Sequence, residues 1–364
     1  MKFDKDDLNQ VPRRQFFEVT GGLSVSALLA SAGQAFPQNK DSSQKIRMGV
    51  VGGGFGSSFQ WQEHPHCVVT GVTDLRPDRR DRLRQTYHCD AVYDSLEIMI
   101  EKAQDIDAVA VFSGALDHVK HTRMCMERGW HVISAVPACF TLEEAQQLKE
   151  ITKRTGLRYM MAETGYYRQE CILMRELFKK GALGNLFYTE CEYYHDRGDL
   201  DALVTNKHTR FYEPDGSRSW RWGYPPMHYP THSLAYVTGV TGERSQWFGD
   251  KSTFYMAKGG VHGSKFKFRT KGETSSRYGL PEQEGGDIRI PEYWKSNMLP
   301  KAMQHRSGHG GSHTFISAEF VNALLEEREP AINVDDALAM TVPGIVAQQS
   351  ALKNGEQLVV PQFA

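Results

Sequence analysis

Three glycines and one aspartate are the residues whose types and spacing most clearly indicate chemistry. Gly52, Gly54 and Gly56 follow a short apolar strand, a helix can follow them, and Asp74 closes the next apolar run. In a dinucleotide-binding turn, the glycines permit the tight bend, a close approach of the pyrophosphate, and packing of helix on strand. A carboxylate at the end of the second strand can bind ribose hydroxyls. Ser57 takes the usual place of the third glycine, and the pattern still favours a dinucleotide site over a glycine-rich structural loop.

The identity of the dinucleotide follows from the charges near Asp74. A carboxylate at this place repels the 2′-phosphate of NADP, so Asp74 favours NAD. Arg76, Arg79 and Arg80 come shortly after it and keep NADP open as the less favoured cofactor. We therefore expect NAD.

The segment 131–139, HVISAVPAC, offers very little chemistry. It has the pattern of a buried strand that runs into a proline, and it carries no charged side chain after His131. In doubly wound sheets, ligands bind at the carboxyl ends of the strands. Any proton transfer at this strand end must therefore come from side chains of other segments.

Alternating strands and helices position these residues. Strands are expected over 45–51, 68–73, 91–93, 108–112, 130–135 and 158–162, and helices over 77–87, 95–102, 118–128 and 142–155. This alternation predicts an α/β fold whose N-terminal Rossmann domain is a doubly wound parallel sheet. The glycine turn, Asp74 and the end of the HVISAVPAC strand then meet at one edge of that sheet.

From Gly165 onward the pattern changes. A helix is expected over 171–180, followed at 184–194 by an alternating segment suited to a sheet with one covered face. A glycine-rich stretch of strands is expected over 240–290, and two late helices over 314–327 and 334–353. These elements predict a C-terminal α+β domain around an open, mostly antiparallel sheet. We expect an NAD-binding domain over 44–164 and a substrate and oligomerisation domain over 165–364.

The composition excludes several classes of partner. The chain has 364 residues, 40% of them hydrophobic and 24% charged, enough for two domains with separate cores. Its 43 basic and 44 acidic residues nearly cancel, so no overall field favours nucleic acid or an anionic membrane surface. The six cysteines include no C-x-x-C pair, which argues against a zinc module or a disulfide framework.

The first 43 residues have the character of an export signal. Residues 12–17, PRRQFF, precede a weakly apolar run over 19–32 and a small-residue cleavage site at 33–35. The run is too short and too rich in Gly, Ser and Thr to span a bilayer, so no integral membrane span is expected. Paired arginines before two phenylalanines resemble a twin-arginine signal and predict a periplasmic protein. The alternative is a basic tail on a cytoplasmic protein.

Histidines spaced four apart raise the question of a metal. His228 and His232 form one such pair, and His305, His309 and His313 form a longer series. On a helix, this spacing would place the side chains on one face. The glycines around His309 disfavour a helix, and no carboxylate stands at ligand spacing. We expect no metal site.

Two further segments complete a recognisable pattern. SGALDH at 113–118 follows the fourth strand, and GWHV at 129–132 begins the fifth. With the glycine turn, they resemble the T-P-x-x-x-H and G-K-H-V motifs of the Gfo/Idh/MocA family of sugar and inositol oxidoreductases, over about residues 45–360. The resemblance implies that the cofactor is held by Gly52, Gly54, Phe55, Gly56, Asp74, Ser113, His118, Val136 and Pro137.

The end of the HVISAVPAC strand departs from most of that family. Members usually have Glu-Lys-Pro there, and the lysine helps to move the proton of the alcohol being oxidised. Here the residues are Ala135, Val136 and Pro137. This is similar to the Glu-Val-Pro-Ala of the NAD-dependent α-N-acetylgalactosaminidases, glycoside hydrolase family 109, although Ala135 departs from that branch as well.

Three other segments resemble the same branch. MMAETGYYR at 160–168, EYYHD at 192–196 and YPTH at 229–232 are similar to its M-M-x-E-N-x-x-Y-G-R, A-Y-I-H-D and Y-P-T-H segments, with Thr164 in place of an asparagine. Residue by residue, the resemblance implies that the catalytic groups of the sugar site are Glu163, Tyr193 and His232.

Oxidation of a sugar hydroxyl needs a base of near-neutral pKa, and histidine is the usual choice. Without the lysine, His232 is the first candidate for this base. The segment 220–232, WRWGYPPMHYPTH, also offers aromatic faces for sugar rings and a guanidinium for hydroxyls or an anion. Its alternative interpretation is an aromatic packing loop stiffened by prolines. The expected substrate contacts are Arg221, Trp222, His228, Tyr229 and His309.

These residues lead to one favoured function and several alternatives. The favoured function is NAD-dependent glycoside hydrolysis by transient oxidation at C3, elimination, water addition and re-reduction. The runner-up is a sugar or polyol dehydrogenase, or an oxidoreductase that reduces a second sugar with the same NADH. A non-catalytic sugar-binding protein is the third possibility. The resemblance also implies a homo-oligomer through the open face of the second sheet.

Overall fold

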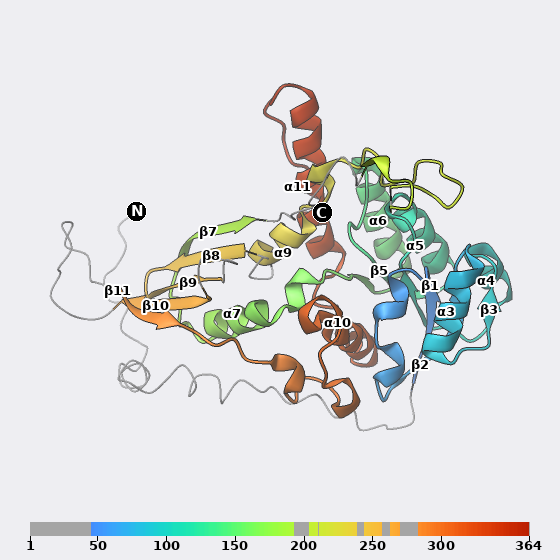
Figure 1. The fold of residues 1–364 in the computed structure, drawn as a ribbon, viewed down its shortest axis with the longest axis horizontal. Coiled ribbons are helices and arrows are strands. Elements are labelled where there is room, and N and C mark those ends of the chain that lie inside the picture. Colours follow the sequence, from blue (N-terminus) through green and yellow to red (C-terminus); the bar gives the residue numbers. More distant parts are fainter. Residues whose placement is uncertain are drawn as a thin grey trace.

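The chain folds around two sheets that lie at opposite ends of its long axis (Figure 1). The computed structural model describes residues 45–192, 204–209, 211–238, 244–256, 263–269 and 283–363. The expected export signal and Tyr193 lie outside the described residues. Helices from the C-terminal part of the chain stand between the two sheets (Figure 1).

The first sheet has six parallel strands in the order β3-β2-β1-β4-β5-β6. Its strands are β1 (Ile46–Val51), β2 (Cys67–Thr73), β3 (Val92–Tyr93), β4 (Ala108–Val111), β5 (His131–Ser134) and β6 (Tyr159–Met161). Its helices are α3 (Pro77–Tyr87), α4 (Leu96–Lys102), α5 (His118–Glu127) and α6 (Leu142–Thr155). The strand order reverses between β1 and β4, where a doubly wound sheet binds its ligand. The predicted fold class is confirmed.

Local signals explain why the helix boundaries were predictable. α6 begins at a capping box, in which the Thr141 hydroxyl accepts a hydrogen bond from the Glu144 amide and the Glu144 carboxylate accepts one from the Thr141 amide. It ends at Gly156, which adopts a left-handed conformation with φ of 66°. α3 begins with Pro77 in its first turn, where a missing amide hydrogen costs nothing.

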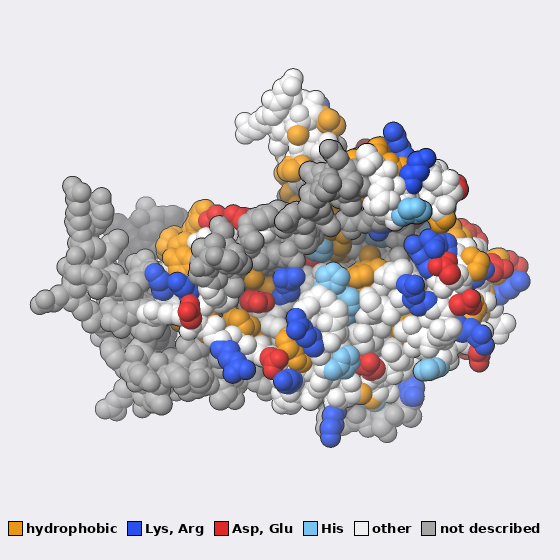
Figure 2. Space-filling model, in the orientation of Figure 1, with side chains coloured by type: hydrophobic (Ala, Val, Ile, Leu, Met, Phe, Trp, Pro, Cys, Tyr) orange, Lys and Arg blue, Asp and Glu red, His pale blue; other side chains and the backbone are white. Residues whose placement is uncertain are grey.

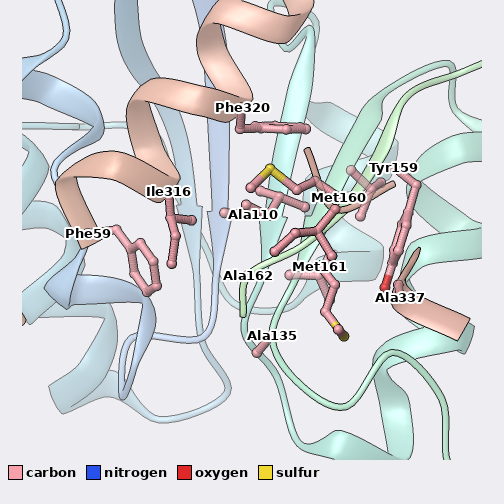
Figure 3. Packing of buried hydrophobic residues seen from close by; sticks show 14 of the residues in the cluster. Phe59, Ala110, Ala135, Tyr159, Met160, Met161, Ala162, Ile316, Phe320 and Ala337 are labelled. Atoms are coloured by element: carbon pink, nitrogen blue, oxygen red, sulfur yellow. The ribbon is translucent and has the colours of Figure 1, made fainter. Parts of the chain in front are cut away.

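The connection after the glycine turn differs from the expectation of a helix. It contains only the single turns η1 (Gly56–Ser58) and η2 (Trp61–Glu63) before β2 begins. The reason is burial, because Phe59 and Trp61 point into the core and are 1% and 0% exposed. The space beside them is filled by α10 (Gly308–Leu325), whose Ile316 and Phe320 lie in the same buried cluster as Phe59 (Figure 3). A C-terminal helix therefore covers the sheet next to the glycine turn.

The second sheet is antiparallel throughout, in the order β11-β10-β9-β8-β7. Its strands are β7 (Leu186–Glu192), β8 (Arg244–Gly249), β9 (Ser252–Tyr255), β10 (Lys265–Arg269) and β11 (Gln283–Asp287). Trp247 and Phe254 are buried, whereas Phe187 and Tyr188 on β7 are 65% and 53% exposed. The prediction of an open antiparallel sheet is confirmed, and the proposed division at residue 164 stays a prediction.

Three more helices belong to the described part of the chain. They are α7 (Gln169–Lys179), α9 (Thr231–Thr238) and α11 (Val334–Leu352). α11 packs against α6, α9 and β6, and its Ala337 lies beside Tyr159 (Figure 3). A Cβ on Gly344 would lie 2.1 Å from the carbonyl oxygen of Met227, so α11 also holds the segment before α9. Among the described residues, no helix is long and apolar enough to cross a bilayer.

Candidate active site

The glycine turn is tightly enclosed between β4 and α3. Gly52 has φ of +95°, and a Cβ there would lie 2.3 Å from the carbonyl oxygen of Phe112. A Cβ on Gly53 would lie 2.4 Å from the carbonyl oxygen of Arg79. Only glycine fits both positions, because a side chain would clash and because φ is positive at the first of them. The turn therefore keeps its backbone bare at the switch point, as a bound dinucleotide requires.

Asp74 is fixed at the edge of this turn. Its Oδ2 accepts a hydrogen bond from the Gly53 amide at 2.7 Å, and its Oδ1 accepts one from the Arg76 amide at 2.8 Å. Each carboxylate oxygen has a second lone pair, which suits ribose hydroxyl donors. The structure thus brings Asp74 together with the predicted turn.

Two of the three arginines that could bind the 2′-phosphate of NADP form ion pairs with carboxylates of the protein. Arg76 pairs with Asp78 at 3.0 Å, and Arg80 pairs with Asp94 at 3.1 Å. Arg79 instead lies over the turn, with its Cζ 3.6 Å from the position of a Cβ on Gly54. Within the described part of the chain, the Arg79 guanidinium forms no ion pair or hydrogen bond.

His118 joins the loops that follow β4 and β5. It is 1% exposed, its Nδ1 lies 2.7 Å from the carbonyl oxygen of Pro137, and its Nε2 lies 3.2 Å from that of Ser113. Burial lowers its pKa, so the ring is neutral and donates one of these hydrogen bonds. His118 thus links the two loops through its carbonyl contacts, and the cofactor contact that the resemblance implied for it stays a prediction. Val136, between them, brings no acid or base to the edge.

Glu163 and His232 form the one contact between two predicted catalytic groups that the described residues show. Glu163 follows β6 and is 0% exposed, and its Oε1 lies 2.6 Å from Nδ1 of His232 at the start of α9. The same oxygen accepts a hydrogen bond from the Gly165 amide at 2.7 Å. The other oxygen, Oε2, is buried with no hydrogen-bond partner among the described residues. The contact thus brings together residues that are 69 positions apart.

The electrostatics of this pair fix the state of both groups. Burial alone would raise the pKa of Glu163, but the neighbouring His232 and the Gly165 amide outweigh it, and the pKa lies below its ordinary value. Glu163 is therefore an anion that receives the Nδ1 hydrogen of His232. Nδ1 of His232 is thus engaged with Glu163 and is not the nitrogen that could accept a proton from a substrate.

The segment before α9 crosses the carboxyl edge of the parallel sheet. Phe140, which follows β5, lies 4.5 Å from the ring of His228, and Trp220 Nε1 lies 3.3 Å from the position of a Cβ on Gly114. Tyr229 lies 5.0 Å from the ring of His232. These contacts bring the start of α9 to the edge that carries the glycine turn.

The same segment also packs on itself. The Arg221 guanidinium lies 4.1 Å from the ring of Trp220, and Trp222 lies 5.3 Å from the ring of Tyr212. His228 is buried and has a lowered pKa because of burial, so it is neutral. The packing-loop interpretation therefore accounts for Trp222, and the segment also carries the predicted site residues His228 and His232.

The three histidines of the series 305, 309 and 313 do not converge on one point. His305 Nε2 pairs with Glu63 at 2.6 Å, whereas Nδ1 of His309 lies 2.8 Å from Nε2 of His313. The ring of His309 lies 5.7 Å from that of Phe55 in the glycine turn. Among the described residues, no three His, Cys, Asp or Glu side chains could hold a metal together. Histidine side chains appear near the middle of the face shown in Figure 2.

Several residues that contact the predicted site residues were not predicted from the sequence. The Gly53 and Gly165 amides act through their backbone, which no side-chain pattern reveals. Phe140 packs against Tyr224 and His228 of the segment 220–232, a contact between residues far apart in the sequence. His313 carried one signal, its spacing from His309, but the spacing suggested a metal and not a hydrogen bond.

Comparison with known proteins agrees with this geometry. Residues 46–163 match the family described as "Oxidoreductase family, NAD-binding Rossmann fold", GFO_IDH_MocA. The first domain is a Gfo/Idh/MocA domain. The predicted family and its cofactor, NAD, are thereby confirmed for this domain.

Curated relatives that the chain resembles include members of glycoside hydrolase family 109. A "Glycosyl hydrolase family 109 protein" of Streptomyces coelicolor is 26% identical over 207 residues, which cover 54% of this chain and 43% of the relative. An "Alpha-N-acetylgalactosaminidase" of Bacteroides fragilis is 29% identical over 142 residues, 37% of this chain and 32% of the relative. The chain thus matches less than half of the length of either relative.

Solved structures share the fold over most of the chain. A levoglucosan dehydrogenase in complex with NADH and levoglucosan has a TM-score of 0.68 at 14% identity, covering 88% of this chain and all of that one. A WlbA dehydrogenase of Bordetella pertussis in complex with NADH and UDP-GlcNAcA has a TM-score of 0.61 at 13% identity, covering 88% and 99%. At these identities the likeness establishes the fold.

Proposed function

We propose that the protein is an NAD-dependent enzyme that cleaves glycosides by transient oxidation of the sugar at C3. The observation that carries the proposal is the buried contact between Glu163 and His232, 2.6 Å from Oε1 to Nδ1. It supplies an oriented base at the carboxyl edge of a dinucleotide-binding sheet that has Val136 where the family usually has lysine. The relatives from glycoside hydrolase family 109 support glycoside cleavage over simple oxidation.

The cofactor would lie along the glycine turn. The bare backbone at Gly52 and Gly53 would accept the pyrophosphate, Asp74 the adenosine ribose, and the turn at Ser113 and Val136 the nicotinamide end. When bound, NAD supplies reversible acceptance of hydride at C3 of the sugar. The protein must supply every proton transfer.

His232 moves the proton of the sugar hydroxyl. As C3 is oxidised, Nε2 of His232 takes the proton from the hydroxyl oxygen at C3, and Glu163 stabilises the imidazolium through Nδ1. The resulting ketone makes the hydrogen at C2 acidic, so the bond from C1 to the leaving group can break by elimination. Water then adds at C1, a proton returns to C2, and reduction of C3 returns the first proton from His232. The sum is hydrolysis with no net oxidation.

The base for the C2 proton is a separate group. Glu163 is a poor candidate, because it is buried and engaged with His232. Tyr193, the other predicted catalytic group, is our candidate for this step. Since one proton leaves the hydroxyl oxygen at C3 and the other leaves C2, separate bases agree with the chemistry.

The alternative function is a sugar or polyol dehydrogenase that releases NADH. Solved neighbours with the same fold include a levoglucosan dehydrogenase, which gives this alternative its support. A sugar-binding protein that keeps NAD without catalysis is the weakest candidate, because it gives no reason for a buried carboxylate–histidine pair.

An assay with aryl glycosides separates these functions. Purified protein is incubated with aryl glycosides or free sugars, with and without added NAD, while aglycone and NADH absorbance are followed together. Glycosidase chemistry predicts aglycone release without net NADH. Stoichiometric NADH from free sugars, with no aglycone, would establish the dehydrogenase instead.

Replacing Arg79 by methionine is expected to weaken NAD binding about tenfold, because its guanidinium lies over the glycine turn without a carboxylate partner. Arg82→Met is the control, since Arg82 is an exposed residue of the same helix. Calorimetric titration of cofactor-free protein measures both. Equal affinity for NAD in the two variants would refute a role in binding the pyrophosphate, and a loss confined to NADP would assign Arg79 to a 2′-phosphate.

Location and assembly belong to the same proposal. The twin-arginine pattern supports export with the cofactor already bound, and Arg13→Lys with Arg14→Lys should retain the protein in the cytoplasm on fractionation.

Exposed Phe187 and Tyr188 on β7 support a homo-oligomer through the second sheet. Sedimentation of Phe187→Asp should show a smaller mass, and an unchanged mass would contradict this interface.

A further inference from the structure

Two buried side chains at the candidate active site each have a polar atom without a hydrogen-bond partner. Thr231, the first residue of α9, is 0% exposed, and its hydroxyl forms no hydrogen bond among the described residues. Oε2 of Glu163, which is also 0% exposed, likewise has none. Such groups are rare in folded proteins, because a buried polar atom loses its water and gains nothing in return. The mechanism above uses neither atom.

The two atoms complement each other chemically. A threonine hydroxyl can donate one hydrogen, whereas the oxygen of an ionised carboxylate can only accept. Oε1 of Glu163 already accepts from Nδ1 of His232 at 2.6 Å and from the Gly165 amide at 2.7 Å, so Oε2 is the oxygen that lacks a donor. Burial raises the pKa of Glu163, and the Thr231 side chain is one of the hydrogen-bonding groups that lower it. The hydroxyl therefore lies close to this carboxylate.

The start of α9 is held in place from two sides. The carbonyl oxygen of Pro230 accepts hydrogen bonds from the amides of Ser233 and Leu234, at 2.9 and 2.8 Å, which begin the helix. A Cβ on Gly344 of α11 would lie 2.3 Å from Cγ of Pro230, so α11 packs directly on the residue before Thr231. The position of Thr231 is thus set by its own helix and by α11.

We propose that Thr231 is a positioning residue of the site, whose hydroxyl donates a hydrogen bond to Oε2 of Glu163. The bond adds a third donor to a carboxylate that burial alone would favour in its neutral form. It keeps Glu163 an anion and fixes the plane of the carboxylate, so that Oε1 stays directed at Nδ1 of His232. The hydrogen bond is argued from the structure alone, whereas its effect on catalysis rests on the proposed function.

Two replacements of Thr231 separate the hydroxyl from the shape of the side chain. Thr231→Val keeps the branched shape and removes the donor, while Thr231→Ser keeps the donor and removes a methyl group. Ser233→Ala is the matched control. Its hydroxyl belongs to the same helix start, but it donates to the carbonyl oxygen of Pro230, at 2.9 Å, and not to the carboxylate.

The ionisation of Glu163 is the first readout, followed in an acid titration through the ¹³C resonance of its carboxyl group. Absence of this resonance in Glu163→Gln identifies it. Thr231→Val should make the acid dissociation constant of Glu163 about tenfold smaller, as the loss of one hydrogen bond to a charged group implies. Thr231→Ser and Ser233→Ala should keep the native constant. A native constant in Thr231→Val would overturn the proposal.

Catalysis is the second readout. On the proposed function, Thr231→Val should lower kcat for aglycone release about tenfold, with unchanged affinity for NAD and with recovery in Thr231→Ser. Equal losses in both replacements would assign Thr231 to packing and contradict the positioning role. A protein that releases no aglycone, yet has a raised pKa of Glu163 in Thr231→Val, would contradict the proposed function and leave the hydrogen bond intact.

The native protein offers a test that needs no variant. A high-resolution crystal structure should place Oγ1 of Thr231 within about 2.8 Å of Oε2 of Glu163, the length of a hydrogen bond from a hydroxyl to a carboxylate. This result would support the proposal even if Thr231→Val failed to fold. A hydroxyl bonded only to a water molecule or to a carbonyl oxygen would refute it.

Discussion

Replacing His232 by alanine is expected to lower kcat for aglycone release by about 10²- to 10⁴-fold, because the base that we propose for the C3 hydroxyl is removed. The prediction follows from the 2.6 Å contact that orients this imidazole against Glu163. The affinity for NAD should change little, since the glycine turn and Asp74 do not contact the ring. Steady-state kinetics and calorimetric titration of NAD measure the two quantities on the same preparation.

The matched control for this variant is His305→Ala. His305 also contacts a carboxylate at 2.6 Å, that of Glu63, but it is exposed and lies outside the pair. Its loss should leave kcat within about twofold of the native value, as for most exposed ion pairs. Equal activity in His232→Ala and the native protein would exclude His232 as the base.

Replacing Glu163 by glutamine is expected to lower kcat about 10²-fold, because a neutral amide cannot stabilise the imidazolium that His232 becomes. The affinity for NAD should again be retained. The variant keeps the size of the side chain, so a loss of kcat reports the charge. A variant with native kcat would show that the carboxylate only supports packing.

The same variant has a signature in stability. The pKa of Glu163 is lowered in the folded chain, so its ionisation stabilises the fold above the ordinary value of 4.5, and this contribution is lost as the pH falls below 4.5 toward the folded pKa. The glutamine variant lacks this titration. Between pH 5 and pH 3, which lie on either side of the ordinary glutamate pKa of 4.5, the thermal midpoint of the variant should therefore fall less than that of the native protein.

The sequence predicted the parallel sheet well because its signals are local. Caps such as Thr141 and Gly156 mark helix ends, and fully buried strands such as β4 appear as continuous apolar runs. The second sheet was predicted only in outline, because its strands are separated by long glycine-rich stretches. The helix α9 was missed, since the prolines before Thr231 resemble a loop until α11 packs against it.

The site likewise contains residues that local spacing predicts and contacts that it does not. Gly52 and Asp74 follow from spacing, because the turn and the strand end are properties of neighbouring residues. Glu163 and His232 were implied as site residues by resemblance to a family, but their contact was not predicted, since no local pattern joins residues 69 positions apart. The hydrogen bond between His309 and His313 depends on left-handed backbone angles that their spacing does not reveal.

The end of the HVISAVPAC strand, where most of the family has a lysine, carries apolar side chains at the edge of the sheet. Ala135 is buried and Val136 is half-buried at the edge of the sheet, so the strand shapes the site without exchanging protons. In the mechanism that we propose, proton transfer passes to His232 at the start of α9.

Isotope exchange tests the elimination mechanism most directly. Aglycone release from an aryl glycoside is run in D₂O, and the sugar product is examined by NMR for deuterium at C2. Transient oxidation at C3 with elimination predicts one solvent deuterium at C2 in each hydrolysed molecule, and none in glycoside recovered from the NAD-free protein. A hydrolysed sugar that keeps its original hydrogen at C2 would contradict the mechanism.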